Sequence, residues 1–413
     1  MDRFKNTIIG TFILLLFAWS GSQNILIAQD HNDEQTTEVQ SEHQEAVLET
    51  HEDIHADVSD ETHEAEEFNA TEVIMEHVSD SHDWHILTTK KGKHVSVPLP
   101  IILYSKETGL KMFMSSKIAH HHHYDGFQYG EDMVKVKTNK KGEKGEKSLD
   151  KTIVYVSEDH SVAGDNGDGI YYHGELASAS IPLDFSITKN VFMMLLATII
   201  LLVVFLSLAR SYKKTGISAP KGLQGFLEPI VIFIEDDVAK PNIGETKYKK
   251  YMPYLLTVFF FILIHNLLGL IPFFPFGANV TGNIAVTMVL AVCTLLITNI
   301  SGNRSYWGHI FNPPGVPLWL YPIMIPVELL GIITKPFALM IRLFANITAG
   351  HIIVLSLVSM IFIFKSAFMA VPSGVLVLFM DMIELLVAFL QAYIFTLLSA
   401  LFIGLAVPEH HHE

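Results

Sequence analysis

Long apolar runs fill the second half of the chain and are separated by short polar links. Three of them have the ~20-residue length of a helix that crosses a bilayer once; they lie at residues 190–208, 251–274 and 284–300. Two further runs, at residues 326–364 and 373–406, are far longer. A helix over the first of these would extend about 60 Å at ~1.5 Å per residue, twice the ~30 Å of hydrocarbon. Because ordinary tilt averages ~20°, the pattern predicts two steeply tilted helices packed as an antiparallel hairpin, with its turn near residues 365–372.

The polar links predict how the chain is threaded through the membrane. Eight basic residues surround the link between the first two runs: Arg210, Lys213, Lys214, Lys221, Lys240, Lys247, Lys249 and Lys250. Basic loops stay in the cytoplasm, which places the N-terminal half outside and the C-terminus inside. Within this link, residues 223–238 have an apolar face and predict a helix along the membrane surface. Residues 301–317 are rich in Gly, Asn and Pro and predict a loop.

The first 28 residues have the pattern of a secretory signal peptide. Arg3 and Lys5 precede an apolar run at residues 8–19, and residues 26–28 suit a cleavage site. A retained anchor is the alternative. Both interpretations export the segment that follows.

The region that we expect to be exported has two parts of different composition. Residues 29–83 are acidic and rich in histidine, without a Lys or Arg, which predicts a disordered, solvated segment. Zinc or copper binding by its histidines is the alternative. Residues 84–180 contain β-like runs between Gly, Asn and Lys clusters and predict a small β-rich exported module. Its His120–His123 run suits an exposed loop, with a metal site as the alternative.

Composition excludes several classes of function. The formal net charge of −15 argues against nucleic acid, because phosphate binding needs a basic face. The single cysteine, Cys293, lies in an apolar run, so one chain cannot form a disulfide framework or a thiolate metal site. We expect no cofactor and no metal at the site considered next.

Arg342 lies deep inside the longest apolar run. Its guanidinium stays charged and needs water, an anion or a carbonyl, and a mid-membrane arginine costs at least ~3 kcal/mol. Snorkelling works near helix ends, whereas Arg342 is more than three turns from either end of the run. The sequence favours a charge that faces an ion path over the alternative, an arginine paired inside a helix bundle.

Five other polar groups share the predicted hairpin with this arginine: Glu328, Asn346, His351, Glu384 and Gln391. At about 100° per residue, Asn346 shares the helix face of Arg342, and His351 falls on the opposite face. An antiparallel hairpin brings Gln391 near Arg342, with His351 and Glu384 toward one side and Glu328 toward the other. This predicts two water-accessible half-paths separated by a fixed positive charge, because His and Glu exchange protons and Arg does not.

Each of these groups also has a purely structural interpretation. Asn346 and Gln391 would then be interhelical hydrogen-bonding groups. His351 and Glu384 would only fix packing, and Glu328 would lie at the head groups. Outside this set, Asp381 is interpreted as water-facing, and His265 and Asn266 as contacts within the bundle. The joint occurrence of five polar groups around one arginine favours the ion path.

Four motifs resemble subunit a of the F-type ATP synthase membrane sector. They are Lys335-Pro336, Arg342-Leu-Phe-x-Asn346-x-x-Ala349-Gly350, Gln391-Ala-x-Ile-Phe and, earlier, Asn266-Leu-x-x-x-Ile-Pro272. The resemblance covers roughly residues 182–412 and says nothing of the region before Ile181. Gly269 stands where some relatives have an acid, so no role in the path is carried over to that position.

The resemblance implies a role for each polar group of the hairpin. Arg342 would face a rotating ring of c subunits and block a proton short-circuit, flanked by Asn346 and Gln391. His351 and Glu384 would belong to the outside half-channel. Glu328 would belong to the cytoplasmic half-channel.

The sequence predicts an all-α polytopic membrane protein over residues 181–413, with three ordinary transmembrane helices and the long tilted hairpin. By resemblance it is a non-catalytic, proton-translocating stator subunit of the bacterial inner membrane. Its implied partners are the c-subunit ring, subunit b of the peripheral stalk, the rest of the ATP synthase and the lipid bilayer, with no nucleic acid. The alternatives are a membrane-anchored periplasmic metal-binding or sensing protein and a secondary transporter. A transporter should show repeated halves, and the sequence has no convincing internal repeat.

Overall fold

The computed structural model describes residues 70–408 apart from short gaps at residues 89–93, 107, 119–122, 139–143, 157–168, 173–174, 178, 216–221, 272–273, 313–316 and 365–366. The expected signal peptide and residues 29–69 of the acidic segment lie outside the described residues, and so do residues 120–122 of the histidine run. The described chain divides into two compact units. One contains Val73–Val97 and Ile187–Glu413, and the other contains Pro98–Ser186.

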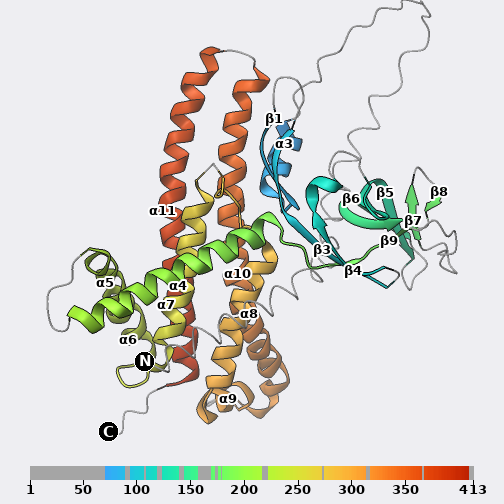
Figure 1. Ribbon diagram of the computed structural model, residues 1–413. Coiled ribbons are helices and arrows are strands. Elements are labelled where there is room, and N and C mark those ends of the chain that lie inside the picture. Colours follow the sequence, from blue (N-terminus) through green and yellow to red (C-terminus); the bar gives the residue numbers. More distant parts are fainter. Residues whose placement is uncertain are drawn as a thin grey trace, which may run out of the picture. The chain divides into compact units, whose positions relative to one another are not determined.

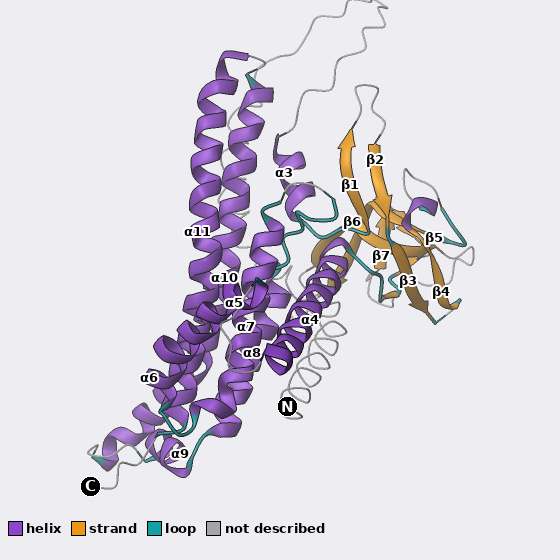
Figure 2. Ribbon diagram, turned by 60° about the vertical axis from the view of Figure 1, so that its left-hand side comes forward, coloured by secondary structure: helices purple, strands orange, loops and turns teal. Residues whose placement is uncertain are grey.

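Five helices of the first unit are long and apolar enough to cross a membrane, within the residues that the structure describes. They are α4 (Lys189–Thr215), α7 (Tyr248–Gly269), α8 (Ile284–Ser301), α10 (Tyr321–Ile363) and α11 (Ala367–Ala406). The last two contain 43 and 40 residues, and Figures 1 and 2 show them side by side. The prediction of three ordinary spans followed by a long hairpin is confirmed.

The core of this unit lies where α7 packs against α11 and α8 packs against α10. Phe259 and Ile262 of α7 are fully buried, and so are Ala388 and Ala392 of α11. Small residues let transmembrane helices approach closely. Many large apolar side chains of α10 and α11 are exposed in the single chain, as expected of helices whose outer faces meet lipid or another subunit.

Three short helices connect α4 to α7. They are α5 (Leu223–Phe233), the π-helix η3 (Ile234–Ala239) and α6 (Lys240–Ile243), so the helix expected at residues 223–238 is present. Lys240 pairs with Asp236 at 2.5 Å and with Glu235 at 3.2 Å. The hydrogen bonds that the Lys240 ammonium donates to Asp236 and Glu235 raise the pKa of Lys240 above its ordinary value, so the link keeps this positive charge.

The loop expected at residues 301–317 is in part a helix, and that prediction was wrong. Helix α9 (Arg304–Phe311) occupies its first half, and the 3₁₀ helix η4 (Leu318–Leu320) follows it. Ile310 is buried, and Trp307 stacks on Phe311 with ring centroids 6.1 Å apart. The backbone N–H of Asn303 donates to the carbonyl oxygen of Ala406 at 3.0 Å. The burial of Ile310, the ring stack within α9 and the hydrogen bond to Ala406 stabilise a helix that the Gly and Pro content of the segment does not favour.

The second unit is made of two antiparallel sheets. The first has the order β10-β3-β4, with β3 (Pro100–Ser105), β4 (Gly109–Met114) and β10 (Leu183–Asp184), and the 3₁₀ helix η2 (Ser115–Lys117) follows β4. The second has the order β8-β7-β5-β6-β9, with β5 (Phe127–Thr138), β6 (Lys144–Val156), β7 (Gly169–Tyr172), β8 (Glu175–Ala177) and β9 (Ala179–Ser180). Ile101, Leu103, Phe113 and Phe127 form its buried core. A β-rich module before the membrane helices is thus confirmed.

The structure divides the region before the membrane helices at a different place from the one expected. Helix α3 (Ala70–Val78) lies in the segment predicted to be disordered, and β1 (Asp83–Thr88) pairs with β2 (His94–Pro98). Trp84 of β1 packs with Met193, Ala278 and Val280 of the membrane unit. Burial of a large aromatic side chain against the membrane helices explains why residues 73–97 join that unit and not the β-rich one.

Candidate functional site

Arg342 lies near the middle of α10, on a face that is exposed in the single chain. Ala338, Ala345 and Asn346 are exposed on the same stretch, whereas Leu343 and Ile347 point into the core. Asn346 therefore shares the face of Arg342, as helical spacing predicted. Among the residues that the structure describes, none forms an ion pair with Arg342. The described residues therefore do not support the alternative, in which Arg342 is paired inside the helix bundle.

Gln391 of α11 contacts α10 at the arginine. Its Nε2 donates a hydrogen bond to the carbonyl oxygen of Arg342 at 2.6 Å, and the residue is 3% exposed. The predicted approach of these two residues in an antiparallel hairpin is confirmed. A carbonyl oxygen has two lone pairs, so this bond can add to the helical one and fix the turn that carries the guanidinium.

His351 and Glu384 face each other across the same hairpin. His351 Nδ1 is hydrogen-bonded to Glu384 Oε1, and the side chains are 11% and 5% exposed. Gly350 leaves room for this carboxylate, since a Cβ at that position would lie 3.0 Å from Glu384 Oε1. The predicted neighbourhood of the two groups is confirmed. An imidazole and a carboxylate in contact can share a proton, accept one and release it.

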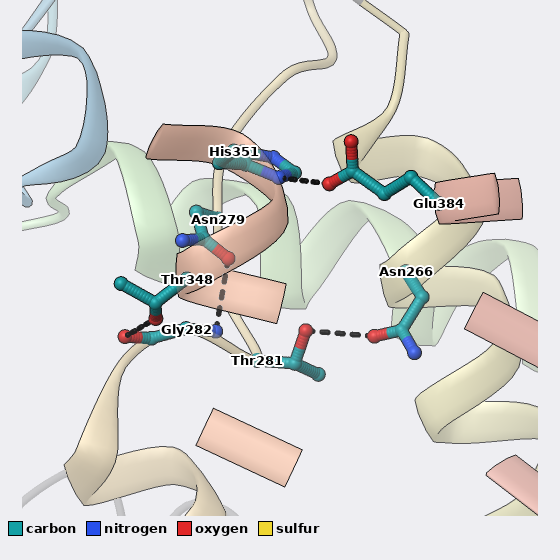
Figure 3. A network of polar contacts seen from close by, with 7 residues as sticks. All are labelled: Asn266, Asn279, Thr281, Gly282, Thr348, His351 and Glu384. Atoms are coloured by element: carbon teal, nitrogen blue, oxygen red, sulfur yellow. Dashed lines mark hydrogen bonds and ion pairs between the residues drawn. The ribbon is translucent and has the colours of Figure 1, made fainter. Parts of the chain in front are cut away.

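A set of hydrogen bonds ties the α7–α8 link to the hairpin beside this pair (Figure 3). Thr281 Oγ1 donates to Asn266 Oδ1 at 2.7 Å, and Asn266 Nδ2 donates to the carbonyl oxygen of Ala388 at 3.2 Å. Thr348 Oγ1 donates to the carbonyl oxygen of Gly282 at 3.4 Å. Sequence reasoning interpreted Asn266 as a bundle contact and missed both threonines. The one signal in the sequence is their hydroxyl groups within otherwise apolar surroundings.

Gly269, at the end of α7, lies next to the other nitrogen of the histidine. A Cβ at Gly269 would be 4.0 Å from His351 Nε2 and 3.4 Å from the carbonyl oxygen of Ala278. The position where some relatives carry an acid therefore lies within reach of His351. In this chain the backbone of the α7–α8 link forms that wall of the site.

Glu328 stands apart from the other five groups. It is exposed on α10, 14 residues before Arg342, or about 21 Å along the axis at ~1.5 Å per residue. Tyr306 of α9 lies close enough to Glu328 for the two side chains to interact electrostatically. Burial raises the pKa of the Tyr306 phenol, and the negative charge of Glu328 raises it further. Tyr306 donates a hydrogen bond to Asn299 Oδ1 at 3.2 Å. A cavity of about 20 Å³ beside them is lined in part by Thr294, Thr298, Asn299, Tyr306 and Lys335.

Within the described residues, no three His, Cys, Asp or Glu side chains lie close enough together to hold a metal ion. Residues 29–69, which carry most of the histidines behind the metal-binding alternative, lie outside them.

These observations define a class of protein. Five apolar helices form the described membrane unit. Its long hairpin holds an exposed arginine and a nearly buried histidine–carboxylate pair. Ionisable groups inside apolar spans are costly and mark ion pathways. The chain has the structure of a multi-pass membrane protein that moves ions.

Comparison with known proteins identifies the family. A family model described as "ATP synthase A chain" matches residues 191–404, and one described as a domain of unknown function (DUF8433) matches residues 73–166. The chain is 49% identical to ATP synthase subunit a of Chloroherpeton thalassium over 235 residues, which is 55% of this chain and 69% of the relative. It is 54% identical to ATP synthase subunit a 2 of Chlorobaculum tepidum over 233 residues, 55% of this chain and 64% of the relative. It is 49% identical to ATP synthase subunit a of Pelodictyon phaeoclathratiforme over 251 residues, 58% and 72% of the two chains.

The chain belongs to the family of subunit a of the F-type ATP synthase. It is the proton-translocating, non-catalytic stator subunit of that enzyme. The expected family is confirmed, and the transporter alternative is wrong.

Proposed function

We propose that the exposed face of α10 around Arg342 meets a ring of c subunits. The observation that carries this proposal is the arginine itself, which is exposed halfway along a 43-residue apolar helix. An isolated cation there cannot face lipid without a large penalty. Ala338 and Ala345 on the same face leave room for a neighbouring helix to approach closely.

The chemistry of this contact follows from the permanent charge of Arg342. A carboxylate on the ring that passes the guanidinium is favoured in its ionised form. Away from the arginine it must be neutral, because an unpaired carboxylate in hydrocarbon is very costly. Each passage therefore releases one proton and takes up another. Asn346 and Gln391 hold and flank the arginine, and a guanidinium that keeps its protons prevents a direct leak.

His351 and Glu384 supply the outside half-channel in this proposal, and Glu328 supplies the cytoplasmic one. The contact of the first pair supports a shared proton. The 23 residues from Glu328 to His351 put about 35 Å of helix between the two groups at ~1.5 Å per residue, with Arg342 between them. Tyr306 and the cavity beside it lie on the Glu328 side and can extend that half-channel.

Partners and orientation complete the proposal. We infer that the chain lies in the bacterial inner membrane with its N-terminal region in the periplasm and its C-terminus in the cytoplasm, because basic residues flank the α4–α7 link. Subunit b of the peripheral stalk would hold it against rotation. The c-ring is the partner that the Arg342 face requires.

Substitution of the arginine tests the central claim. In proteoliposomes that contain the complete synthase, Arg342→Ala should abolish proton-driven ATP synthesis and ATP-driven pumping, because no cation remains to force the ring carboxylate to release its proton. Arg342→Lys should fail to restore it, since an ammonium can lose its proton where a guanidinium cannot. Arg304→Ala removes an exposed arginine of α9 outside the spans and serves as the control, with synthesis unchanged. Retained pumping in Arg342→Ala would refute the assigned role.

A further inference from the structure

Residues 77–84, which we call the brace segment, lie before the region that matches subunit a and yet hold the start of α4. Asp80 Oδ1 accepts a hydrogen bond from the backbone N–H of Asn190 at 3.1 Å, and Asp80 Oδ2 accepts one from Thr188 Oγ1 at 2.8 Å. The backbone N–H of Lys189 donates to the carbonyl oxygen of Ser81 at 3.0 Å. A carboxylate that receives the free N–H groups of a first helical turn acts as an N-terminal cap. This cap comes from a residue 110 positions away in the sequence.

Lys189 makes a second contact between the brace segment and the start of α4. The Lys189 ammonium is nearly buried and donates to the carbonyl oxygen of His77 at 3.0 Å. The pKa of Asp80 lies above its ordinary value, because burial raises it more than the Asn190 and Thr188 hydrogen bonds and the charges of Lys189 and His82 lower it. The carboxyl group is thus held by hydrogen-bond donors from the start of α4.

Trp84, at the end of the brace segment, reaches the α7–α8 link. Its ring meets Phe192 of α4 and Phe274 of the link edge-to-face, with centroids 5.8 and 5.5 Å apart. It is 6% exposed and packs in a buried cluster with Ala278 and Val280. The side chain of Trp84 therefore fills the space between the start of α4 and the link.

The link that Trp84 contacts is the wall of the His351 site. Ala278, beside Trp84, has its carbonyl oxygen within 3.4 Å of a Cβ placed on Gly269, which is the position next to His351 Nε2. Thr281 and Gly282, directly after this cluster, make the hydrogen bonds to Asn266 and from Thr348. Trp84 thus packs on a link whose backbone lies beside Gly269, near His351, and which accepts a hydrogen bond from Thr348, three residues before His351.

We propose that the brace segment is a positioning element of the outside half-channel. Asp80 fixes the segment to the start of α4, and Trp84 holds the α7–α8 link at the distance from His351 that proton uptake requires. The inference rests on the proposed role of His351 and Glu384. It gives a role to part of the stretch that matches a domain of unknown function. The brace segment does not exchange protons itself. It sets the geometry of groups that do.

The test uses complete synthase in proteoliposomes driven by acid–base jumps, with the pH of the acidic compartment varied at a constant membrane potential. Trp84→Ala should lower the ATP synthesis rate at least about threefold, because small displacements of reacting groups have large kinetic effects. It should also shift the dependence of the rate on acidic-side pH, because the surroundings of His351 and Glu384 change. Asp381 on α11 is the other charged group that interacts with this pair, and it stays unaltered. Trp84→Phe keeps an aromatic wedge and should restore both readouts.

Controls separate positioning from folding. Met75→Ala removes an exposed side chain of α3 and should match the parent protein. Asp80→Asn keeps one acceptor oxygen for Asn190 and should fall between the parent protein and Trp84→Ala. An assembled Trp84→Ala complex with an unchanged pH profile would overturn the proposal. Loss of assembly in Trp84→Ala and Asp80→Asn alike would overturn it too, since the segment would then only hold the fold.

A reference variant distinguishes this inference from the proposed function. His351→Gln should shift the same pH profile. If His351→Gln leaves the profile unchanged, the role of the His351–Glu384 pair fails and the inference falls with it. If His351→Gln shifts the profile and Trp84→Ala does not, only the positioning role of the brace segment is wrong.

Discussion

Helical phase separates the polar groups of α10 into two sets. His351 lies nine positions after Arg342, which at about 100° per residue is two and a half turns. The arginine is therefore exposed, while the histidine meets Glu384 of α11. Glu328 is 14 residues before Arg342, which returns to within about 40° of the same face, and it is exposed as well. Helical phase therefore separates the exposed groups of α10 from the histidine that contacts α11.

This dependence on phase explains how much of the site could be predicted from the sequence. The approach of Gln391 to Arg342 and of Glu384 to His351 needs only two continuous helices in antiparallel register. Thr281 lies in an irregular link, and Thr348 bonds to a backbone oxygen of that link. An irregular link has no periodicity from which its path could be predicted, so the contacts of both threonines could not be derived.

The close approach of Glu384 to Gly350 predicts the effect of adding one methyl group at that position. A Cβ there would lie 3.0 Å from Glu384 Oε1, so Gly350→Ala must push the carboxylate a few tenths of an ångström away from its present contact with His351. We expect proton-driven ATP synthesis to fall about tenfold, because misplacing a proton-transfer group is costly in rate. Gly374→Ala in α11, where an added Cβ meets nothing within 4 Å, is the control and should keep the parent rate. Equal rates for the two variants would show that the carboxylate tolerates the shift.

The helices and strands differ in how well the sequence predicts them. The excess length of α10 and α11 over a membrane is a property of composition, and it sufficed to predict the hairpin. Helices α3 and α9 are nine and eight residues long, too short to be stable alone. They are held by tertiary contacts, such as the bond from Asn303 to Ala406. A local pattern cannot report a contact that lies a hundred residues away.

The contact between α11 and α6 gives a prediction about helix packing. A Cβ on Gly404 would lie 1.8 Å from the carbonyl oxygen of Asn242 and 2.8 Å from its carbonyl carbon. Because both atoms are backbone, Gly404→Ala must separate the two helices. Overpacking typically costs ~1–3 kcal/mol, so we expect subunit a to dissociate from the purified synthase at a lower temperature. Gly374→Ala again serves as the comparison. An unaltered dissociation temperature in Gly404→Ala would mean that α6 moves freely away from α11.

The two structural units do not coincide with the segments that the family comparisons match. The subunit a match covers residues 191–404, whereas the match to the domain of unknown function, residues 73–166, contains parts of both units. The helix cap from Asp80 and the packing of Trp84 place the first residues of the second match on the membrane unit. Because its beginning is part of the membrane unit, the extension contacts the helices of that unit directly, as the proposed positioning role requires.

The orientation of the chain leads to the last prediction. The basic link around α5 and α6 should face the cytoplasm and the β-rich unit the periplasm. Cys293 is the single cysteine, so Cys293→Ala gives a background for labelling. Glu245→Cys and Ser116→Cys then place one thiol at an exposed position in the link or after β4. In intact cells with a permeable outer membrane, an impermeant maleimide should label Ser116→Cys and leave Glu245→Cys unlabelled. In inverted inner-membrane vesicles the pattern should reverse, and detergent should allow both to react. Labelling of Glu245→Cys in intact cells would show that the chain has the opposite orientation. The half-channel of His351 and Glu384 would then open toward the cytoplasm.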